Sequence, residues 1–325
     1  MADSPHPTSP GGLLITGASG FLGEPLIQLA QTQGQVQGIY HRHSVVPATA
    51  RTATIDRVTE DRLTEDRVTE DRVTYHRLDL TNTSAVTEWF QHWRPDGVIH
   101  TAALSQPNRC EQNPDLSYAI NVQASETLAT LCREDQIPLV FTSTDQVFGG
   151  QAPPYDETSL PNPINTYGRH KLEAEQRIRS LYPAATLCRL PLLYGPPSAH
   201  GACFLQDFLA RLRRGQSLYL FTDEYRTPAY VEDVAAGLLL ALKHPGLLLH
   251  LGGPERLSRY EFGLRMAEVF DLDAQLIQPC RQADVAMAAA RPADVSSNNQ
   301  RAMDLGYRPR GISAGLEAVR QRESP

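Results

Sequence analysis

The stretch Leu13-Leu14-Ile15-Thr16-Gly17-Ala18-Ser19-Gly20-Phe21-Leu22-Gly23 decides the fold. A short apolar run, typical of a buried strand, enters a turn with three glycines, and Phe21 to Gln31 continues with helical spacing of apolar residues. The first glycine permits a tight turn, the second allows close approach of backbone N–H groups to an anion, and the third allows close helix–sheet packing. Because a helix N-terminus attracts anions, the stretch predicts a dinucleotide pyrophosphate site. The expected contacts are Gly17, Ser19, Gly20, Phe21, Leu22 and Gly23.

Strand and helix patterns alternate through the first half of the chain. Further strands are expected at Val36 to Tyr40, Tyr75 to Leu78, Gly97 to His100, Leu139 to Thr142 and Thr186 to Leu190, and helices notably at Ser117 to Arg133 and Thr166 to Leu181. This alternation predicts an α/β fold, a Rossmann doubly wound parallel sheet with helices on both faces.

A smaller C-terminal lobe is expected to bind the substrate. Helices are predicted at Phe204 to Arg213 and at Arg259 to Phe270, the second opened by a capping box of Ser258 and Glu261. We expect residues 1–190 to form the nucleotide-binding domain and residues 191–325 to form mainly the second lobe, with 229–252 returning to the first.

A five-residue repeat interrupts the alternation. Arg57 to Thr74 reads RVTED, RLTED, RVTED and RVT, and a period of five matches neither a helix nor a strand. We interpret residues 57–74 as a solvated loop inserted between the second and third strands. A charged docking segment is the alternative.

Composition excludes several classes of protein. The chain has 325 residues and a net charge of -7, which argues against a nucleic-acid partner. Its five cysteines form no CxxC pair, which fits reduced thiols in a cytoplasmic protein. The apolar run Val234 to Leu242 is too short to span a bilayer and predicts a core helix. The ten histidines show no HxxxH or HExxH pairing, so no metal is expected.

The end of the second strand bears on which cofactor binds. A carboxylate there would hydrogen-bond the ribose 2′-hydroxyl of NAD. This chain instead has Tyr40-His41-Arg42-His43, which contains no carboxylate. Because Arg42 can pair with a 2′-phosphate, we expect NADP, and the alternative is that Arg42 is a surface arginine. Asp79 is placed to reach the adenine amino group, and small residues after the fourth strand permit close approach. The remaining expected cofactor contacts are His41, Leu80, Thr101, Ala102, Ala103, Thr142 and Leu190.

Tyr167 and Lys171 lie four residues apart on a predicted helix and therefore share one face. A neighbouring ammonium favours the phenolate and should lower the pKa of the tyrosine, which suits proton transfer to a carbonyl oxygen. Lys171 is also expected to hold the nicotinamide ribose. The hydroxyl of Thr144, at the end of the fifth strand, can stabilise charge on the same oxygen. Asn121 can hold a water that relays protons to Lys171.

These motifs resemble the extended short-chain dehydrogenase/reductase family, and within it the dTDP-4-dehydrorhamnose reductase branch. The similar stretches are Thr142-Ser143-Thr144-Asp145-Gln146-Val147-Phe148, Tyr167-Gly168-Arg169-His170-Lys171-Leu172-Glu173, Arg226-Thr227-Pro228, Val231-Glu232-Asp233-Val234-Ala235 and Arg291-Pro292. The resemblance implies reduction of the 4-keto group of a nucleotide sugar with NADPH or NADH, with Thr144, Tyr167, Lys171 and Asn121 as the catalytic set. It implies that Leu104, Asp145, Gln146 and Arg226 face the substrate.

Two departures and two alternatives accompany this interpretation. Gln146 stands where the branch usually has Tyr, and the repeat is unusual for it. The branch also resembles the methionine adenosyltransferase β subunit, so an NADP-binding regulatory subunit is one alternative. A related epimerase or reductase of another small carbonyl substrate is the second. A homodimer is compatible with either.

Overall fold

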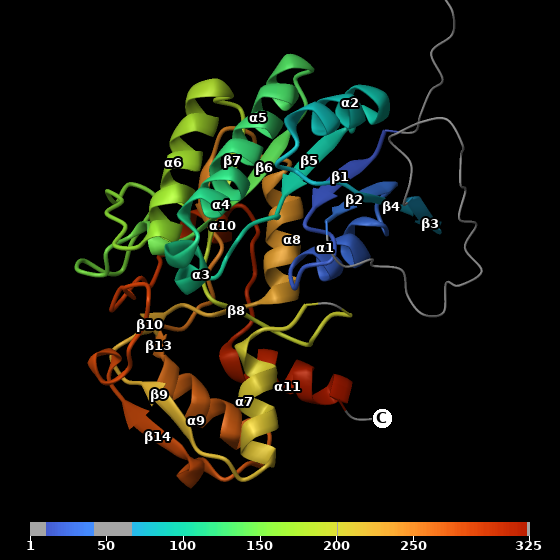
Figure 1. Ribbon diagram of the computed structural model, residues 1–325. Coiled ribbons are helices and arrows are strands. Elements are labelled where there is room, and N and C mark those ends of the chain that lie inside the picture. Colours follow the sequence, from blue (N-terminus) through green and yellow to red (C-terminus); the bar gives the residue numbers. More distant parts are fainter. Residues whose placement is uncertain (1–10, 42–66, 200, 324–325) are drawn as a thin grey trace, which may run out of the picture.

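The computed structural model describes residues 11–41, 67–199 and 201–323, and these residues contain an eight-stranded sheet (Figure 1). Seven of the strands are parallel and only the edge strand β3 is antiparallel to its neighbour. In spatial order they are β12 (Leu248–His250), β7 (Thr186–Leu190), β6 (Leu139–Thr144), β5 (Gly97–His100), β1 (Leu13–Thr16), β2 (Val36–Tyr40), β4 (Val73–Arg77) and β3 (Arg67–Glu70).

Strand β1 sits at the point where the strand order reverses, with β2 on one side and β5 on the other. Crevices at the carboxyl ends of strands next to such a point are where open α/β sheets bind ligands. The predicted Rossmann doubly wound sheet is confirmed, and the glycine turn after β1 opens onto this crevice.

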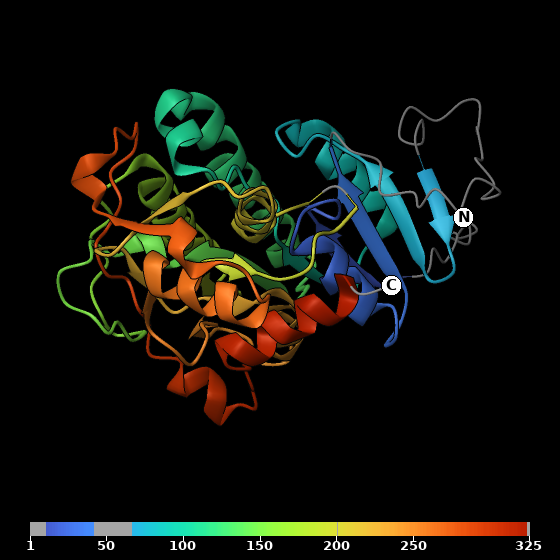
Figure 2. The same cartoon turned by 90° about the horizontal axis from the view of Figure 1, so that it is seen from below.

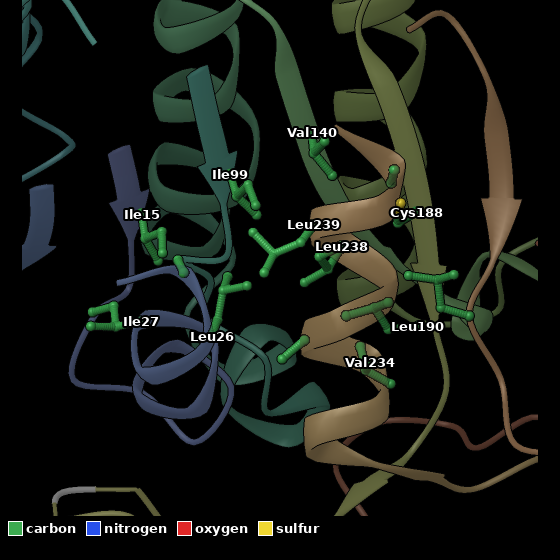
Figure 3. Close-up of a cluster of buried hydrophobic side chains, with 14 of the residues drawn as sticks. Ile15, Leu26, Ile27, Ile99, Val140, Cys188, Leu190, Val234, Leu238 and Leu239 are labelled. Atoms are coloured by element: carbon green, nitrogen blue, oxygen red, sulfur yellow. The ribbon is translucent and has the colours of Figure 1, made fainter. Parts of the chain in front are cut away.

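Helices cover both faces of the sheet (Figure 1). Successive side chains of a strand point to opposite faces, so Ile15 and Leu14 belong to different cores. The first core packs against α1 (Gly23–Ala30), α8 (Val231–Ala241) and α10 (Gln300–Asp304), as Figure 3 shows for Leu26 and Leu238. The second packs against α2 (Thr83–Trp93), α5 (Ala124–Glu134) and α6 (Thr166–Leu181).

The helix expected from Ser117 to Arg133 is divided in the structure. Two short helices, α3 (Pro107–Gln112) and α4 (Pro114–Tyr118), precede a π-helical segment at Ala119–Gln123, which leads into α5. The widened turn places Asn121 in the interior, beside the backbone of Leu104. Such π segments occur often at functional sites.

A second, smaller group of elements lies below the sheet in Figure 1 and is seen from below in Figure 2. Its core joins the helices and strands into one hydrophobic cluster, in which Phe262 and Leu205 are buried. The predicted capping box is confirmed, because Ser258 Oγ accepts from Glu261 N at 3.1 Å and Ser258 N donates to Glu261 Oε2 at 2.7 Å. The elements of this group are α7 (Phe204–Arg213), β9 (Leu218–Phe221), α9 (Arg259–Val269), β14 (Ile277–Cys280) and α11 (Ile312–Glu323).

The remaining elements are short strand pairs and single turns. The pairs are β8 (Leu193–Tyr194) with β11 (Ala229–Tyr230) and β10 (Tyr225–Arg226) with β13 (Leu257–Ser258), and the 3₁₀ turns are Asp145–Val147, Ala274–Leu276 and Gln282–Asp284. After β11 the chain enters α8 and then β12, which pairs with β7. The division into domains at residue 190 stays a prediction.

The interpretation of residues 57–74 as a loop is wrong for their last part. Strand β3 pairs with β4 in antiparallel register, with Thr69 opposite Thr74 and their hydroxyl oxygens 3.3 Å apart. Asp71, in the turn between the strands, has a φ of 50°, a conformation that Asp tolerates better than most residues. Arg57 to Asp66 lie outside the described residues, as does Arg42.

Within the described ranges, none of the helices has both the length and the apolar character needed to cross a membrane. The same ranges hold no group of three or more His, Cys, Asp or Glu side chains arranged to bind a metal ion.

Replacing Leu238 by Ala should destabilise the sheet core. Leu238 on α8 is fully buried between the sheet and α1, and truncating such a side chain leaves a cavity that costs about 2–5 kcal/mol. Urea unfolding of the variant measures this loss. The matched control is Leu160→Ala, which removes the same atoms from a side chain that is 88% exposed and should change stability by about 0.5 kcal/mol or less. Equal losses in both variants would contradict the assignment of Leu238 to the core.

Candidate functional site

A cavity of about 680 Å³ lies at the carboxyl edge of the sheet. This volume is within the range of small-molecule and cofactor sites. Its wall combines the glycine turn, the ends of five strands, the start of α6 and side chains of the second group of elements. The predicted site residues found in this wall are Gly17, Ser19, Gly20, Phe21, Leu22, Gly23, His41, Asp79, Leu80, Thr101, Ala102, Ala103, Leu104, Thr142, Thr144, Asp145, Gln146, Tyr167, Lys171, Leu190 and Arg226.

Two glycines of the turn are required by its geometry. Gly17 has a φ of +73°, and a Cβ there would lie 2.9 Å from Ala102 N, on the neighbouring strand end. A Cβ on Gly23 would overlap the carbonyl oxygen of Gly17. The close approach of α1 to the end of β1 therefore depends on the missing side chains, and it leaves the start of the helix facing the cavity.

His41 and Asp79 meet at the ends of β2 and β4. His41 Nε2 lies 3.6 Å from Asp79 Oδ2, while Asp79 Oδ1 accepts from Thr81 N at 2.9 Å and from Thr81 Oγ1 at 2.8 Å. Both side chains line the cavity, where the adenosine end of a dinucleotide is expected. Arg42, on which the expected choice of NADP rests, lies outside the described residues.

Local hydrogen bonds fix the start of α6, which carries Tyr167 and Lys171. Asn165 is the N-cap, and its Oδ1 accepts from Gly168 N at 2.8 Å. Its Nδ2 donates to Gln146 Oε1 at 3.0 Å, so Gln146 connects the end of β6 to this helix. Because the cap is buried and bonded on both sides, the helix begins at a fixed position beside Thr144.

Burial dominates the electrostatics of Tyr167 and Lys171. It raises the pKa of Tyr167, against a hydrogen bond with Thr144 that lowers it, and it lowers the pKa of Lys171 to about 7. Lys171 Nζ lies 4.0 Å from the centre of the Phe141 ring, over its face. The expected lowering of the tyrosine pKa is therefore wrong for this structure, because burial makes it costly to charge either group.

Asp145 follows Thr144 and is buried at the end of the cavity nearest the second group of elements. Its Oδ1 accepts from Thr144 Oγ1 at 3.2 Å, and its Oδ2 lies 3.6 Å from Arg226 Nε. Burial raises the pKa of Asp145 to about 6, although Arg226 opposes the shift. Asp145 thus titrates close to neutral pH next to the Thr144 hydroxyl.

Arg226 is held by several acceptors. Its Nη1 donates to the carbonyl oxygens of Tyr225 at 2.8 Å and Pro292 at 3.1 Å, and its Nη2 lies 3.3 Å from Glu224 Oε1. These contacts join the end of β6 to the second group of elements. They also occupy most of the N–H donors of the Arg226 guanidinium, so few remain for a ligand.

Charged side chains outside the predicted site residues also line the cavity. Arg259 Nε lies 3.4 Å from Glu224 Oε1, and Arg291 and Arg109 lie in the same wall. Among the described residues, Arg259 Nη1 and Arg291 Nη1 are buried with no hydrogen-bond partner. Arg259 could have been found from the sequence, because it is the first residue of a predicted helix. A positive charge is unfavourable at a helix N-terminus, and its presence there indicates a role other than stabilising the helix.

Asn121 is the described site residue that the structure does not bring to the cavity wall. Its Oδ1 accepts from Leu104 N at 3.0 Å, and its Nδ2 donates to Leu104 O and Ser117 Oγ, both at 3.1 Å. The side-chain amide is therefore occupied in holding the backbone of Leu104, which does line the cavity. A water relay through Asn121 stays a prediction.

Comparisons with known proteins agree with this geometry. The family model described as RmlD substrate binding domain matches residues 11–323. The chain is 32% identical over 284 residues to the probable low-salt glycan biosynthesis reductase Agl14 of Haloferax volcanii, covering 86% of each chain. It is 32% identical over 225 residues to methionine adenosyltransferase 2 subunit beta of Xenopus tropicalis, covering 67% of each. A dTDP-4-dehydrorhamnose reductase structure from Clostridium acetobutylicum has a TM-score of 0.79 at 25% identity, covering 97% of this chain and 100% of that one.

Replacing Asp145 by Asn should make stability less sensitive to pH. Because the folded pKa of Asp145 is raised to about 6, the unfolded chain ionises first, and the wild type loses stability as the pH rises from about 4 to 7. The variant lacks this loss. Urea unfolding should therefore show the wild type falling relative to Asp145→Asn by about 2 kcal/mol between about pH 4 and pH 8.

Asp156→Asn is the matched control for this titration. Hydrogen bonds from Thr158 and Ser159 lower the pKa of Asp156 to about 2. Both its folded and unfolded states are ionised above about pH 5, so any difference from the wild type should stay constant from there to pH 8. A constant difference for Asp145→Asn as well would show that Asp145 does not titrate in this range.

Proposed function

The chain belongs to the RmlD substrate-binding domain family of extended short-chain dehydrogenases/reductases, and on that premise we propose that it reduces the 4-keto group of a nucleotide sugar. The enzyme class is an NAD(P)-dependent oxidoreductase. The proposal for the substrate is supported by the names of its relatives, a glycan biosynthesis reductase and a dTDP-4-dehydrorhamnose reductase.

One observation carries the proposal. Thr144, Tyr167 and Lys171 come from a strand end and a helix start, and all three line the cavity that the glycine turn also lines. A hydroxyl, a phenol and an ammonium in one ligand-sized space suit carbonyl reduction, which needs a proton donor and a stabiliser of negative charge on oxygen.

The residues present fit a nicotinamide dinucleotide. The turn at Gly17 to Gly23 lines the cavity and brings the start of α1 to it, as a pyrophosphate requires. Thr101 and Ala102 form the wall beside it, and Thr101 Oγ1 donates to Thr16 O at 2.6 Å. When bound, the cofactor supplies the hydride.

The chain's own residues supply the proton and the orientation of the substrate. In this proposal the Thr144 hydroxyl turns from Asp145 Oδ1 and donates its hydrogen bond to the carbonyl oxygen, and the Tyr167 hydroxyl gives that oxygen its proton. The raised pKa of Tyr167 keeps the phenol protonated at neutral pH, as reduction requires. Lys171 holds the ribose of the cofactor through its ammonium hydrogens. The guanidinium groups of Arg259 and Arg291 offer donors to the acidic nucleotide part of the substrate.

A second candidate function is regulation of a partner. The match to methionine adenosyltransferase 2 subunit beta, at 32% identity, favours it. The intact Thr144, Tyr167 and Lys171 set favours the enzyme, because a purely regulatory subunit has no need of a proton donor.

Tyr167→Phe should lower the rate of NADPH oxidation with a dTDP-4-keto-6-deoxy sugar by about 10²- to 10⁴-fold, since it removes the proton donor. Binding of NADPH, measured by fluorescence titration, should persist. The matched control is Tyr219→Phe, which removes a hydroxyl from an exposed ring on β9 and should leave the rate unchanged. No turnover by the wild type with a panel of 4-keto nucleotide sugars, together with a stoichiometric partner on purification, would favour the regulatory function.

The proposed preference for NADP is tested by thermal shift. At a fixed concentration, a ligand that binds only the folded state raises the melting temperature more the tighter it binds. NADPH should raise it more than NADH, and Arg42→Ala should reduce that difference. A larger shift with NADH in the wild type would contradict the preference.

A further inference from the structure

The chain contains only two lysines, Lys171 and Lys243. Lys243 is exposed at the end of α8, whereas Lys171 is about 1% exposed and is among the largest fully buried side chains of the described residues. A buried ammonium loses its hydration and tends to release its proton. The proposed function requires the charged form of Lys171, so something in its surroundings must favour that form.

Four titratable groups belong to the elements packed around Lys171. They are His100 on β5, Cys110 on α3, and Tyr167 and Glu175 on α6. Burial lowers the pKa of His100 to about 3 and raises the pKa of Cys110 and Tyr167, so all three are uncharged at neutral pH. Glu175 is therefore the group among these four that can supply negative charge.

Glu175 lies one helical turn after Lys171 and is itself 4% exposed. Arg189, on β7, binds it with two hydrogen bonds, from Nε to Oε1 at 2.9 Å and from Nη2 to Oε2 at 2.7 Å. A bidentate pair of this kind fixes a buried carboxylate in its charged form. Arg189 is anchored in turn, with its guanidinium 5.0 Å from the centre of the Phe148 ring.

We propose that Glu175, held by its buried ion pair with Arg189, is a positioning residue that keeps the Lys171 ammonium charged within the cavity. This inference rests on the proposed function for its biological purpose but not for its test. Glu175 opposes the effect of burial on the pKa of Lys171, and it does so from the side of α6 that faces β7, outside the cavity wall.

The test uses NMR of isotope-labelled lysine side chains in the whole, cofactor-free protein. Only two signals arise, and Lys243 serves as the internal reference. Glu175→Gln should lower the pKa of Lys171 by about one unit, because it removes an opposite charge close to the ammonium. Glu175→Asp, which keeps the charge, should recover most of the wild-type titration. Glu173→Gln is the matched control, since it makes the same change in charge on the outer face of α6 and should leave Lys171 unmoved.

A second variant keeps the test decisive if Glu175→Gln does not fold. The double change Glu175→Met with Arg189→Met leaves no unpaired buried arginine, and such apolar replacements often preserve stability. It should lower the pKa of Lys171 in the same direction. An unchanged Lys171 titration in either folded variant would overturn the proposal.

Turnover gives an independent readout. The alkaline limb of the rate–pH profile should move to lower pH in Glu175→Gln and stay in place in Glu173→Gln, whereas a merely structural role would lower the rate without moving the limb. A shifted NMR titration in a protein without turnover would refute the proposed function and leave the role of Glu175 standing.

Discussion

Desolvation at the carboxyl edge of the sheet is the constraint on which the rest of the site depends. A lysine, a tyrosine and an aspartate are buried there within one cavity wall, and burial is the largest influence on the pKa of each. The same burial that makes charge costly also strengthens every remaining interaction with charge. Buried charges at this edge therefore need opposite charges close by. The structure provides two such pairs, Glu175 with Arg189 and Asp145 with Arg226.

The sheet and the cofactor end of the cavity could be predicted because local sequence determines them. The strand at Leu13 to Thr16, the glycine turn and the helix Thr166 to Leu181 have the expected bounds, since apolar periodicity and caps act within a few residues. Gly17 and Gly23 are needed for a backbone shape that the turn itself dictates. A spacing of four residues also suffices to place Tyr167 and Lys171 on one face.

Other features depend on contacts between distant parts of the chain and had no local signal. The hairpin that places Thr69 opposite Thr74 arises from pairing with β4, and the five-residue period gave no sign of this strand. The side-chain amide of Asn121 is turned to Leu104 by a π-helical segment, which periodicity does not predict. Arg259 and Arg291 reach the cavity only because the second group of elements folds back over the edge of the sheet.

Two glutamates on α6 have different roles because they lie on different faces of the helix. Glu173 and Glu175 are two residues apart on α6, and each pairs with an arginine. Glu173 is about a third exposed on the outer side, where water screens its charge and the pair contributes little to stability. Glu175 points toward the sheet, where the low dielectric extends its influence to the neighbouring ammonium. Helix α6 thus carries Tyr167 and Lys171 and, one turn after Lys171, the carboxylate of Glu175 that favours the charged form of Lys171.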